Sequence, residues 1–217
     1  MALVENRVLK IAKFAAGSIT SDRLTGYQSK AVAQFEPPYF ELARSGCIFG
    51  YSGGVVANAV APVQDAPTTA AAYCLYNGYA AGGKVLVPLL VSVRASSGTM
   101  GLGAALLLGV TVIAEATPVA NGTGVVGPAY LGGSRSVSTS AKLGSGVTLD
   151  AACAWMAVAS IAQPAAVQTG AGINFEPKGM FIVRPGCLLG ITVLAPAGTT
   201  AKYTTDVIWA ELAPDLV

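Results

Sequence analysis

Short runs of apolar residues, broken by glycine and proline, follow one another along most of the chain and predict β-strands rather than long helices. Lys84–Arg94 is a continuous β-branched and leucine-rich run, as expected of a strand buried on both faces. Pro88 lies inside this run, which indicates an edge position or a β-bulge. In Leu102–Glu115 the Val-Thr-Val-Ile run favours a strand, and Gly103 and Gly109 count against a helix. The other predicted strands are Ala71–Asn77, Val147–Leu149, Ala154–Ala162, Gly179–Arg184, Leu188–Leu194 and Thr204–Leu212.

Turn residues separate these strands, and their spacing indicates the fold class. Asn77-Gly78 follows one strand, and Pro185-Gly186 and Pro196-Ala197-Gly198 flank another. The closing segments, from Phe181 onwards, predict three strands joined by compact turns. Frequent strands with this turn chemistry predict an all-β sandwich or barrel.

The last predicted strand has a regular alternation of side chains. Thr205, Val207 and Trp209 fall on one face, while Asp206, Ile208 and Ala210 fall on the other. We therefore expect Trp209 to face the core and Asp206 to face solvent.

Charged residues are concentrated near the N-terminus, and this divides the chain. Residues 1–45 hold ten of the 24 charged residues, and Pro37-Pro38 marks a plausible junction. We predict an N-terminal arm over residues 1–45 and a β-sandwich domain over residues 46–217.

The overall charge is low, which limits the classes of partner. Only 11% of residues are charged and the net charge is +2, against about 25% charged residues in an average domain. Such a chain has no basic field with which to bind nucleic acid. Its longest uncharged apolar stretch, Gly101–Ala114, is shorter than the roughly 18 residues of a membrane span. Charges scattered through the first 17 residues interrupt any signal-peptide core, so we expect synthesis in the cytoplasm without a signal peptide.

The inventory of reactive side chains argues against an enzyme. Histidine is absent, which removes the commonest general base and metal ligand. No glycine-rich segment completes a phosphate-binding loop. We therefore expect no catalysis, no cofactor and no metal. One enzymatic alternative stays open, a glycosidase pair formed in space by two of the carboxylates Asp150, Glu176, Asp206, Glu211 and Asp215.

Four cysteines, Cys47, Cys74, Cys153 and Cys187, lie far apart among small or apolar neighbours. They contain no CxxC pair of the kind that zinc sites use. Two disulfides are formally possible, but buried reduced thiols are the better interpretation.

Self-association is the leading inference from the low charge. Permanent interfaces are depleted in Lys, Glu and Asp, and the run Ala95–Ser134 contains a single charge, Glu115. We predict an interface within this run and a symmetric homo-oligomer. Arg7, Lys10 and Lys13 fall at three-residue spacing, as on one face of a short helix. This stripe is either a solvated face or a contact with a partner or nucleic acid.

Two features resemble the small jelly-roll proteins of tailed-phage virions over roughly residues 68–217. One is the aromatic-then-glycine turn at Tyr73–Lys84, and the other is the closing FIVRPGCLLGITVLAP…YTTDVIWAEL. The resemblance implies a jelly-roll-like β-sandwich with an N-terminal extension. It implies a capsid cement or decoration subunit that binds and stabilises the phage head shell and is located in the virion.

The resemblance also implies partners. They are other copies of the chain in a homotrimer and the major capsid protein, with neither membrane nor nucleic acid expected. An N-terminal segment that reaches a neighbouring subunit would give Arg7, Lys10 and Lys13 the partner contact. A trimeric receptor-binding or fibre-head module is the first alternative, which exposed aromatics such as Tyr73, Tyr76 and Tyr79 would favour. A shell-forming coat protein is the second.

Overall fold

A computed structural model gives the fold of the chain. It describes residues 23–24, 30–31, 39, 42–43, 45–53, 59–68, 70–99, 103–112, 123–126, 137–149, 153–162, 172–196 and 200–214. The chain divides into two units, Met1–Pro38 and Tyr39–Val217, so that the division follows Pro37-Pro38 directly. In the first unit, β1 (Arg23–Leu24) and β2 (Lys30–Ala31) pair antiparallel.

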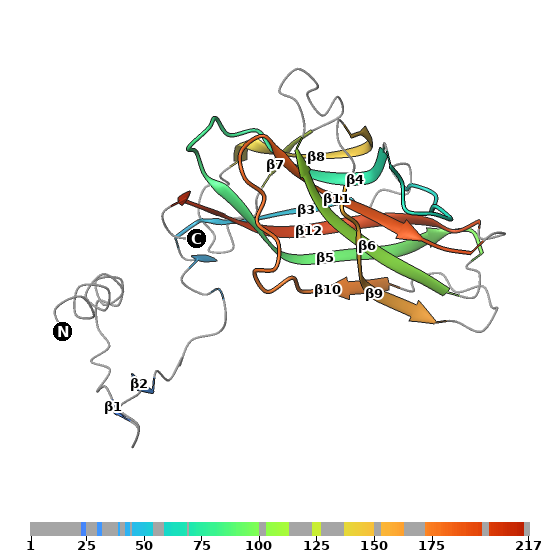
Figure 1. Cartoon of the computed structure of the whole chain (residues 1–217), viewed down its shortest axis with the longest axis horizontal. Helices are drawn as coiled ribbons and strands as arrows, with labels where there is room; N and C mark the ends of the chain where they lie inside the picture. Colours follow the sequence, from blue (N-terminus) through green and yellow to red (C-terminus); the bar gives the residue numbers. More distant parts are fainter. Residues whose placement is uncertain are drawn as a thin grey trace. The chain divides into compact units, whose positions relative to one another are not determined.

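The second unit is a sandwich of two antiparallel sheets (Figure 1), which confirms the predicted all-β sandwich class. The four-stranded sheet has the order β10-β5-β12-β3, and the six-stranded sheet has the order β7-β8-β4-β11-β6-β9. The strands of the first sheet are β3 (Ile48–Ser52), β5 (Val85–Ser97), β10 (Gly172–Phe175) and β12 (Lys202–Leu212). Those of the second are β4 (Ala70–Asn77), β6 (Gly103–Val112), β7 (Thr123–Val126), β8 (Val137–Thr148), β9 (Met156–Ala162) and β11 (Cys187–Leu194).

The strand pairing is nested. Strand β3 pairs with β12, β4 with β11, β5 with β10, and β6 with β9. The β7–β8 hairpin is inserted between β6 and β9 in sequence, and it extends the six-stranded sheet beyond β4. The chain thus runs as one long hairpin wound across two sheets.

This winding gathers the connections at two opposite ends of the sandwich. We call the end where β5 begins and β12 ends the first end; it holds the connections 78–84 and 176–186. At the second end lie the described residues 53, 59–68, 98–99, 195–196 and 200–201, and β8 ends there beside the start of β4.

The core lies between the inner faces of the two sheets. Val207 and Trp209 of β12 are fully buried there, and Trp209 stacks on Phe49 of β3 with the ring centroids 6.1 Å apart. The predicted inward face of β12 is therefore confirmed. Burying a tryptophan removes about 150–250 Å² from water, which contributes on the order of 4–6 kcal/mol at ~25 cal/mol per Å².

The outer face of the four-stranded sheet is covered near the first end. Ile48, Leu89 and Ala210 form a small apolar cluster there, against which Leu42 and Ala43 pack. Ala210 was predicted on the solvent side of β12, but it is fully buried. The reason is that the segment preceding β3 folds over this face.

Pro88 lies in β5, which is an interior strand between β10 and β12, so the predicted edge position is wrong. The predicted bulge is confirmed, because the pairing between β12 and β5 shifts register where Trp209 meets Pro88. A proline interrupts the ladder by removing a backbone donor, and the bulge accommodates this loss.

Two other predictions need correction. Gly179–Arg184 is not a strand: only Val183 forms a bridge, with Leu86, because a turn with positive φ at Lys178 and Gly179 precedes it. Strands β11 and β12 follow one another in the chain, but they belong to different sheets. The short strands β3, β7 and β10 were not predicted, and β8 is longer than Val147–Leu149.

Candidate interaction surface and polar site

Arg7, Lys10 and Lys13, the predicted partner contact, lie outside the described residues. Their contact with a partner therefore stays a prediction. By sequence they belong to the first unit, Met1–Pro38.

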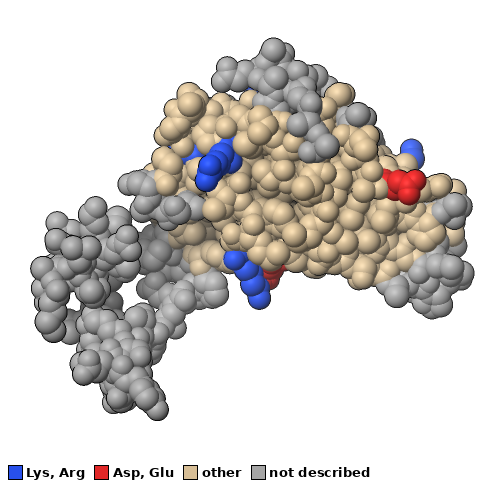
Figure 2. Space-filling model, in the orientation of Figure 1, with Lys and Arg blue, Asp and Glu red and all other residues tan. Residues whose placement is uncertain are grey.

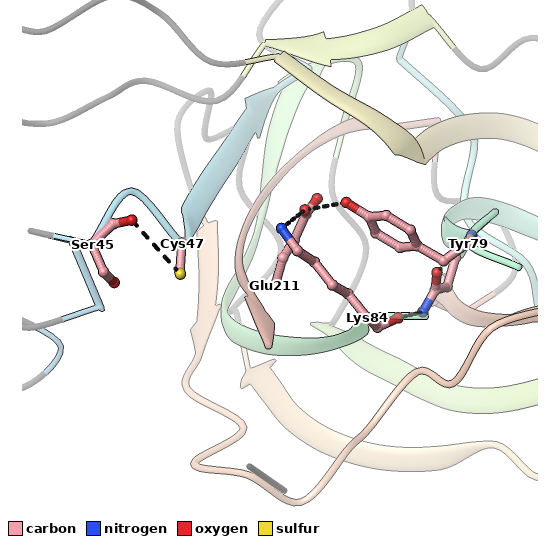
Figure 3. A network of polar contacts seen from close by, with 6 residues as sticks. Ser45, Cys47, Tyr79, Lys84 and Glu211 are labelled. Carbon is pink, nitrogen blue, oxygen red and sulfur yellow. Dashed lines mark hydrogen bonds and ion pairs between the residues drawn. The ribbon is translucent and has the colours of Figure 1, made fainter. Parts of the chain in front are cut away.

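The most buried charged side chain among the described residues is Glu211, near the end of β12 at the first end (Figure 3). Its side chain is only 1% exposed. The Tyr79 hydroxyl donates a hydrogen bond to Oε2 of Glu211 over 2.6 Å, and Lys84 Nζ lies 3.7 Å from the same oxygen. Lys84 Nζ is also 5.9 Å from the centroid of the Tyr79 ring. The Glu211 carboxylate is thus bound by the Tyr79 hydroxyl and the Lys84 ammonium, both of which belong to the connection 78–84.

The local sequence places Tyr79 and Lys84 for this role. Asn77, fully buried at the end of β4, accepts the Tyr79 N–H at its Oδ1 over 3.1 Å. Its Nδ2 donates to the carbonyl oxygens of Lys84, at 2.9 Å, and Val183, at 2.8 Å. Gly82 has a φ of +80°, which suits glycine. These contacts fold the connection back so that both side chains reach Glu211.

Glu211, Tyr79 and Lys84 connect segments that are distant in the chain, and their contacts stabilise the fold. Backbone N–H of Glu211 donates to the Cys47 carbonyl over 2.8 Å, so β12 is tied both to the segment before β3 and to the connection 78–84. Oε1 of Glu211 has no hydrogen-bond partner among the described residues. Because the side chain is almost fully enclosed, it faces protein groups and not an open site. Sequence reasoning treated Glu211 as an isolated carboxylate, since Tyr79 and Lys84 lie far from it in the chain.

A row of polar side chains from all four strands lies on the outer face of the four-stranded sheet. Asp206 of β12 accepts a hydrogen bond from Ser52 Oγ over 2.6 Å and lies 3.0 Å from Arg94 Nη2. Ser92 Oγ, on the neighbouring strand, donates to Asn174 Oδ1 over 2.6 Å. Ser52, Asp206, Ser92 and Asn174 lie in register across all four strands, and Arg94 is two residues beyond Ser92 on β5. They satisfy one another, and the predicted solvent side of Asp206 is confirmed by its partial exposure.

The carboxylates of Asp206 and Glu211 lie on opposite faces of β12, because five residues separate them in a strand whose side chains alternate. They therefore form no pair of the kind a glycosidase needs. Glu176 is exposed in the connection 176–186, and Asp150 and Asp215 lie outside the described residues. Within the described part of the chain, no group of three or more His, Cys, Asp or Glu side chains is placed to hold a metal ion.

The tyrosines considered for a receptor-binding surface are not at exposed loop tips. Tyr73 and Tyr76 are buried in β4. The Tyr73 hydroxyl donates to the Tyr203 carbonyl over 2.6 Å, and burial raises the pKa of Tyr73 to about 12. Tyr79 is half-buried beside Glu211. The aromatic feature that would favour that alternative is therefore missing at these three positions.

The sequence predicted buried reduced thiols: all four cysteines are free thiols, but the predicted burial is confirmed for only two of them. Cys74 and Cys153 are buried, whereas Cys47 and Cys187 are partly exposed. Burial raises the pKa of Cys74 to about 12 and that of Cys153 to about 11, because a thiolate is poorly solvated there.

The lack of charged residues in the run Ala95–Ser134 is explained in part by burial within the subunit. Its central part is β6, an interior strand between β11 and β9, and Ala104, Leu106 and Leu108 are core residues. Burial inside the subunit accounts for the lack of charge here. The described part of this run therefore gives no support to the predicted interface.

Charge is distributed unevenly between the two ends of the sandwich. At the first end, the connections 78–84 and 176–186 contain Lys84, Glu176, Lys178 and Arg184. At the second end, Asp65 is the one charged side chain among the described residues of 53, 59–68, 98–99, 195–196 and 200–201. In the described part of the face shown in Figure 2, charged side chains are isolated groups among uncharged residues.

Comparison with known protein families, with curated proteins and with solved structures finds no match to this chain. Among the described residues we find no helix with the length and hydrophobicity that a membrane span requires.

Proposed function

We propose that this protein is a structural subunit of a tailed-phage virion, of the cement or decoration type, which binds the head shell and stabilises it. The nested strand pairing carries the proposal. A jelly roll is a two-sheet sandwich of eight strands, and this architecture recurs in viral capsid domains. The pairs β3–β12, β4–β11, β5–β10 and β6–β9 supply eight such strands in two sheets.

The low charge supports a role in contacts between proteins. A free monomer ordinarily keeps about 25–35% charged residues on its surface, and this chain has 11% over its whole length. A contact face of ~800 Å² offers a gross term on the order of 10–20 kcal/mol at ~25 cal/mol per Å². Many modest contacts on one shell add up in avidity.

We propose binding without catalysis. The chain has no histidine, and Asp206 and Glu211 lie on opposite faces of β12. The only deeply buried carboxylate among the described residues, Glu211, is engaged by Tyr79 and Lys84.

Solution mass and head binding test the proposal together. The full chain is measured by light scattering after size exclusion at two concentrations, and a mass three times the 21.8 kDa of the chain is expected. It is then mixed with isolated heads of the encoding phage that lack this subunit. Saturable co-sedimentation and greater resistance of the heads to heat are expected.

Other results would replace the proposal. Failure to sediment with the heads would overturn the cement function. Multi-megadalton particles formed by the chain alone would make it a shell-forming coat protein. Binding to host cells without binding to heads would favour the receptor-binding or fibre-head module.

A further inference from the structure

We infer that β9 binds an extended, uncharged segment of the head-shell protein, which adds to the six-stranded sheet as a seventh strand. This inference rests on the proposed function and specifies how the shell is bound. Strand β9 is a terminal strand of its sheet and, among the described strands, pairs with β6 alone. It lies at one side of the sandwich, beside β10 of the other sheet (Figure 1). The outer edge of β9 therefore presents backbone N–H and C=O groups with which a further strand can pair.

The edge of β9 lacks the features that ordinarily prevent strand addition. Its sequence, MAVASIA, has no charged residue and no proline, whereas protected edges contain lysine or proline or are very short. The other terminal strands of the sandwich, β3, β7 and β10, have five, four and four residues, against seven in β9. A β-bulge interrupts the pairing of β9 with β6 between Leu106 and Leu107, and the register is regular on either side of it. Most of the edge is therefore suitable for pairing.

The two faces of β9 determine the chemistry of the segment that fits beside it. Val158 and Ile161 pack against the core, whereas Ala157 and Ser160 are exposed. A strand added beside β9 would place alternate side chains next to these two surfaces. The fitting segment thus has apolar side chains on one face and small uncharged side chains on the other. A charged side chain in it would find no opposite charge on β9.

Symmetry argues against a second copy of this chain as the donor of that segment. The other terminal strands described in the sandwich are too short to pair with all seven residues of β9, so only a second β9 would match it in length. Two β9 strands would pair antiparallel about a two-fold axis, and such a contact is complete with two copies. It cannot join the three copies of the proposed function, in which each β9 is left open to a different protein. The shell protein is the partner that this function supplies.

Lysine substitutions on β9 test the inference. A variant with Ala157→Lys and Ser160→Lys adds two positive charges at exposed positions beside the outer edge, where lysine opposes strand addition. The matched control, Ala80→Lys with Ala81→Lys, adds the same charge at exposed positions of the connection 78–84. Because all four side chains are exposed, both variants are expected to keep the native urea unfolding midpoint.

Binding of each variant to isolated heads that lack this subunit is measured by co-sedimentation. The β9 variant is expected to bind about tenfold more weakly or worse, since main-chain hydrogen bonds to the added strand are lost. The control is expected to bind like the native chain. If the β9 variant binds like the native chain, or if the control is weakened equally, the inference fails while the head-binding function stands.

Amide hydrogen exchange distinguishes strand addition from other kinds of contact. In the free native chain, amides of β9 are expected to exchange faster than those of β11, which is an interior strand. On the heads, the amides of β9 are expected to become protected. Unchanged exchange in β9 on the heads would contradict strand addition. Protection of β9 equal to that of β11 in the free chain would assign this edge to a second copy and overturn the inference. A native chain that does not bind the heads overturns the proposed function, and the inference with it.

Discussion

The indole ring of Trp155 lies against the backbone of Gly190, so closely that a Cβ at position 190 would come within 2.7 Å of Cη2. Gly190 is in the middle of β11, where it pairs with Gly109 of β6 and Cys74 of β4. The two glycines leave the centre of the sheet's outer face without side chains, and Trp155 and Cys153, which precede β9, pack there. Trp155 Nε1 donates to the Pro67 carbonyl over 2.6 Å, which ties this segment to the second end.

Gly190→Ala is expected to destabilise the sandwich by about 1–3 kcal/mol, the usual cost of overpacking. The new methyl group would displace the Trp155 ring and weaken its hydrogen bond to Pro67. Urea unfolding followed by fluorescence measures the loss.

A double-mutant cycle gives the control. In a Trp155→Leu background the smaller side chain leaves room at position 190, so Gly190→Ala is expected to cost clearly less. An equal cost in both backgrounds would show that the ring is not the obstacle.

Lys84→Met is expected to lower the free energy of unfolding by about 1–3 kcal/mol, the cost of leaving a buried polar group unsatisfied. It leaves the Glu211 carboxylate with the Tyr79 hydroxyl as its only described side-chain partner. Adding Glu211→Gln is expected to restore part of the loss, because an amide needs no countercharge. Chemical denaturation of the two single variants and the double variant measures this coupling.

Arg94→Met is the matched comparison for Lys84→Met. Arg94 pairs with Asp206, but their side chains are 63% and 20% exposed, so water screens the pair. We expect a change of at most ~1 kcal/mol. Equal effects of the two substitutions would contradict the distinction between a buried and a screened carboxylate.

The four thiols are expected to differ in reactivity. Cys74 and Cys153 are buried, and their raised pKa values keep them protonated at neutral pH. Pulsed iodoacetamide labelling with mass spectrometry is expected to modify Cys47 and Cys187 in the folded protein. Cys74 and Cys153 are expected to react only after addition of urea. Rapid labelling of Cys74 without denaturant would contradict its burial.

Alkaline pH is expected to reduce stability. The pKa of Cys74 rises from 9.0 to about 12 on folding, so the folded chain keeps a proton that the unfolded chain releases. Between those values the unfolded state binds fewer protons, and the free energy of unfolding falls as pH increases. The contribution is fully present below pH 9.0. Urea titrations from pH 8 to 11 are expected to show a steeper fall for the native chain than for Cys74→Ala, and equal slopes would argue against this assignment.

Most of the long strands followed from local sequence, but the short ones did not. Ala71–Asn77, Lys84–Arg94 and Leu188–Leu194 are rich in β-forming apolar residues, and the structure has strands there. Strands β3 and β10 have only five and four residues. Too few side chains alternate in such segments to separate them from loops, and pairing with β12 and β5 is what makes them strands.

The Glu211 site likewise depends on contacts between residues distant in the chain, which local sequence does not predict. In the sequence, Glu211 has no positively charged residue nearer to it than Lys202. Its partners, Tyr79 and Lys84, precede it by more than 120 residues. Only the nested pairing brings the end of β12 beside the connection 78–84.

The sequence by itself determined the all-β class and the inward face of Trp209; it narrowed Pro88 to an edge or a bulge and favoured reduced thiols over disulfides. These depend on side-chain period, backbone chemistry and local composition, which neighbouring residues set. Tertiary structure alone decided which strands share a sheet, which segments cover the outer faces and which side chains meet the Glu211 carboxylate. Such contacts join residues distant in the chain, and their free energy depends on the whole core being formed, so no local pattern encodes them.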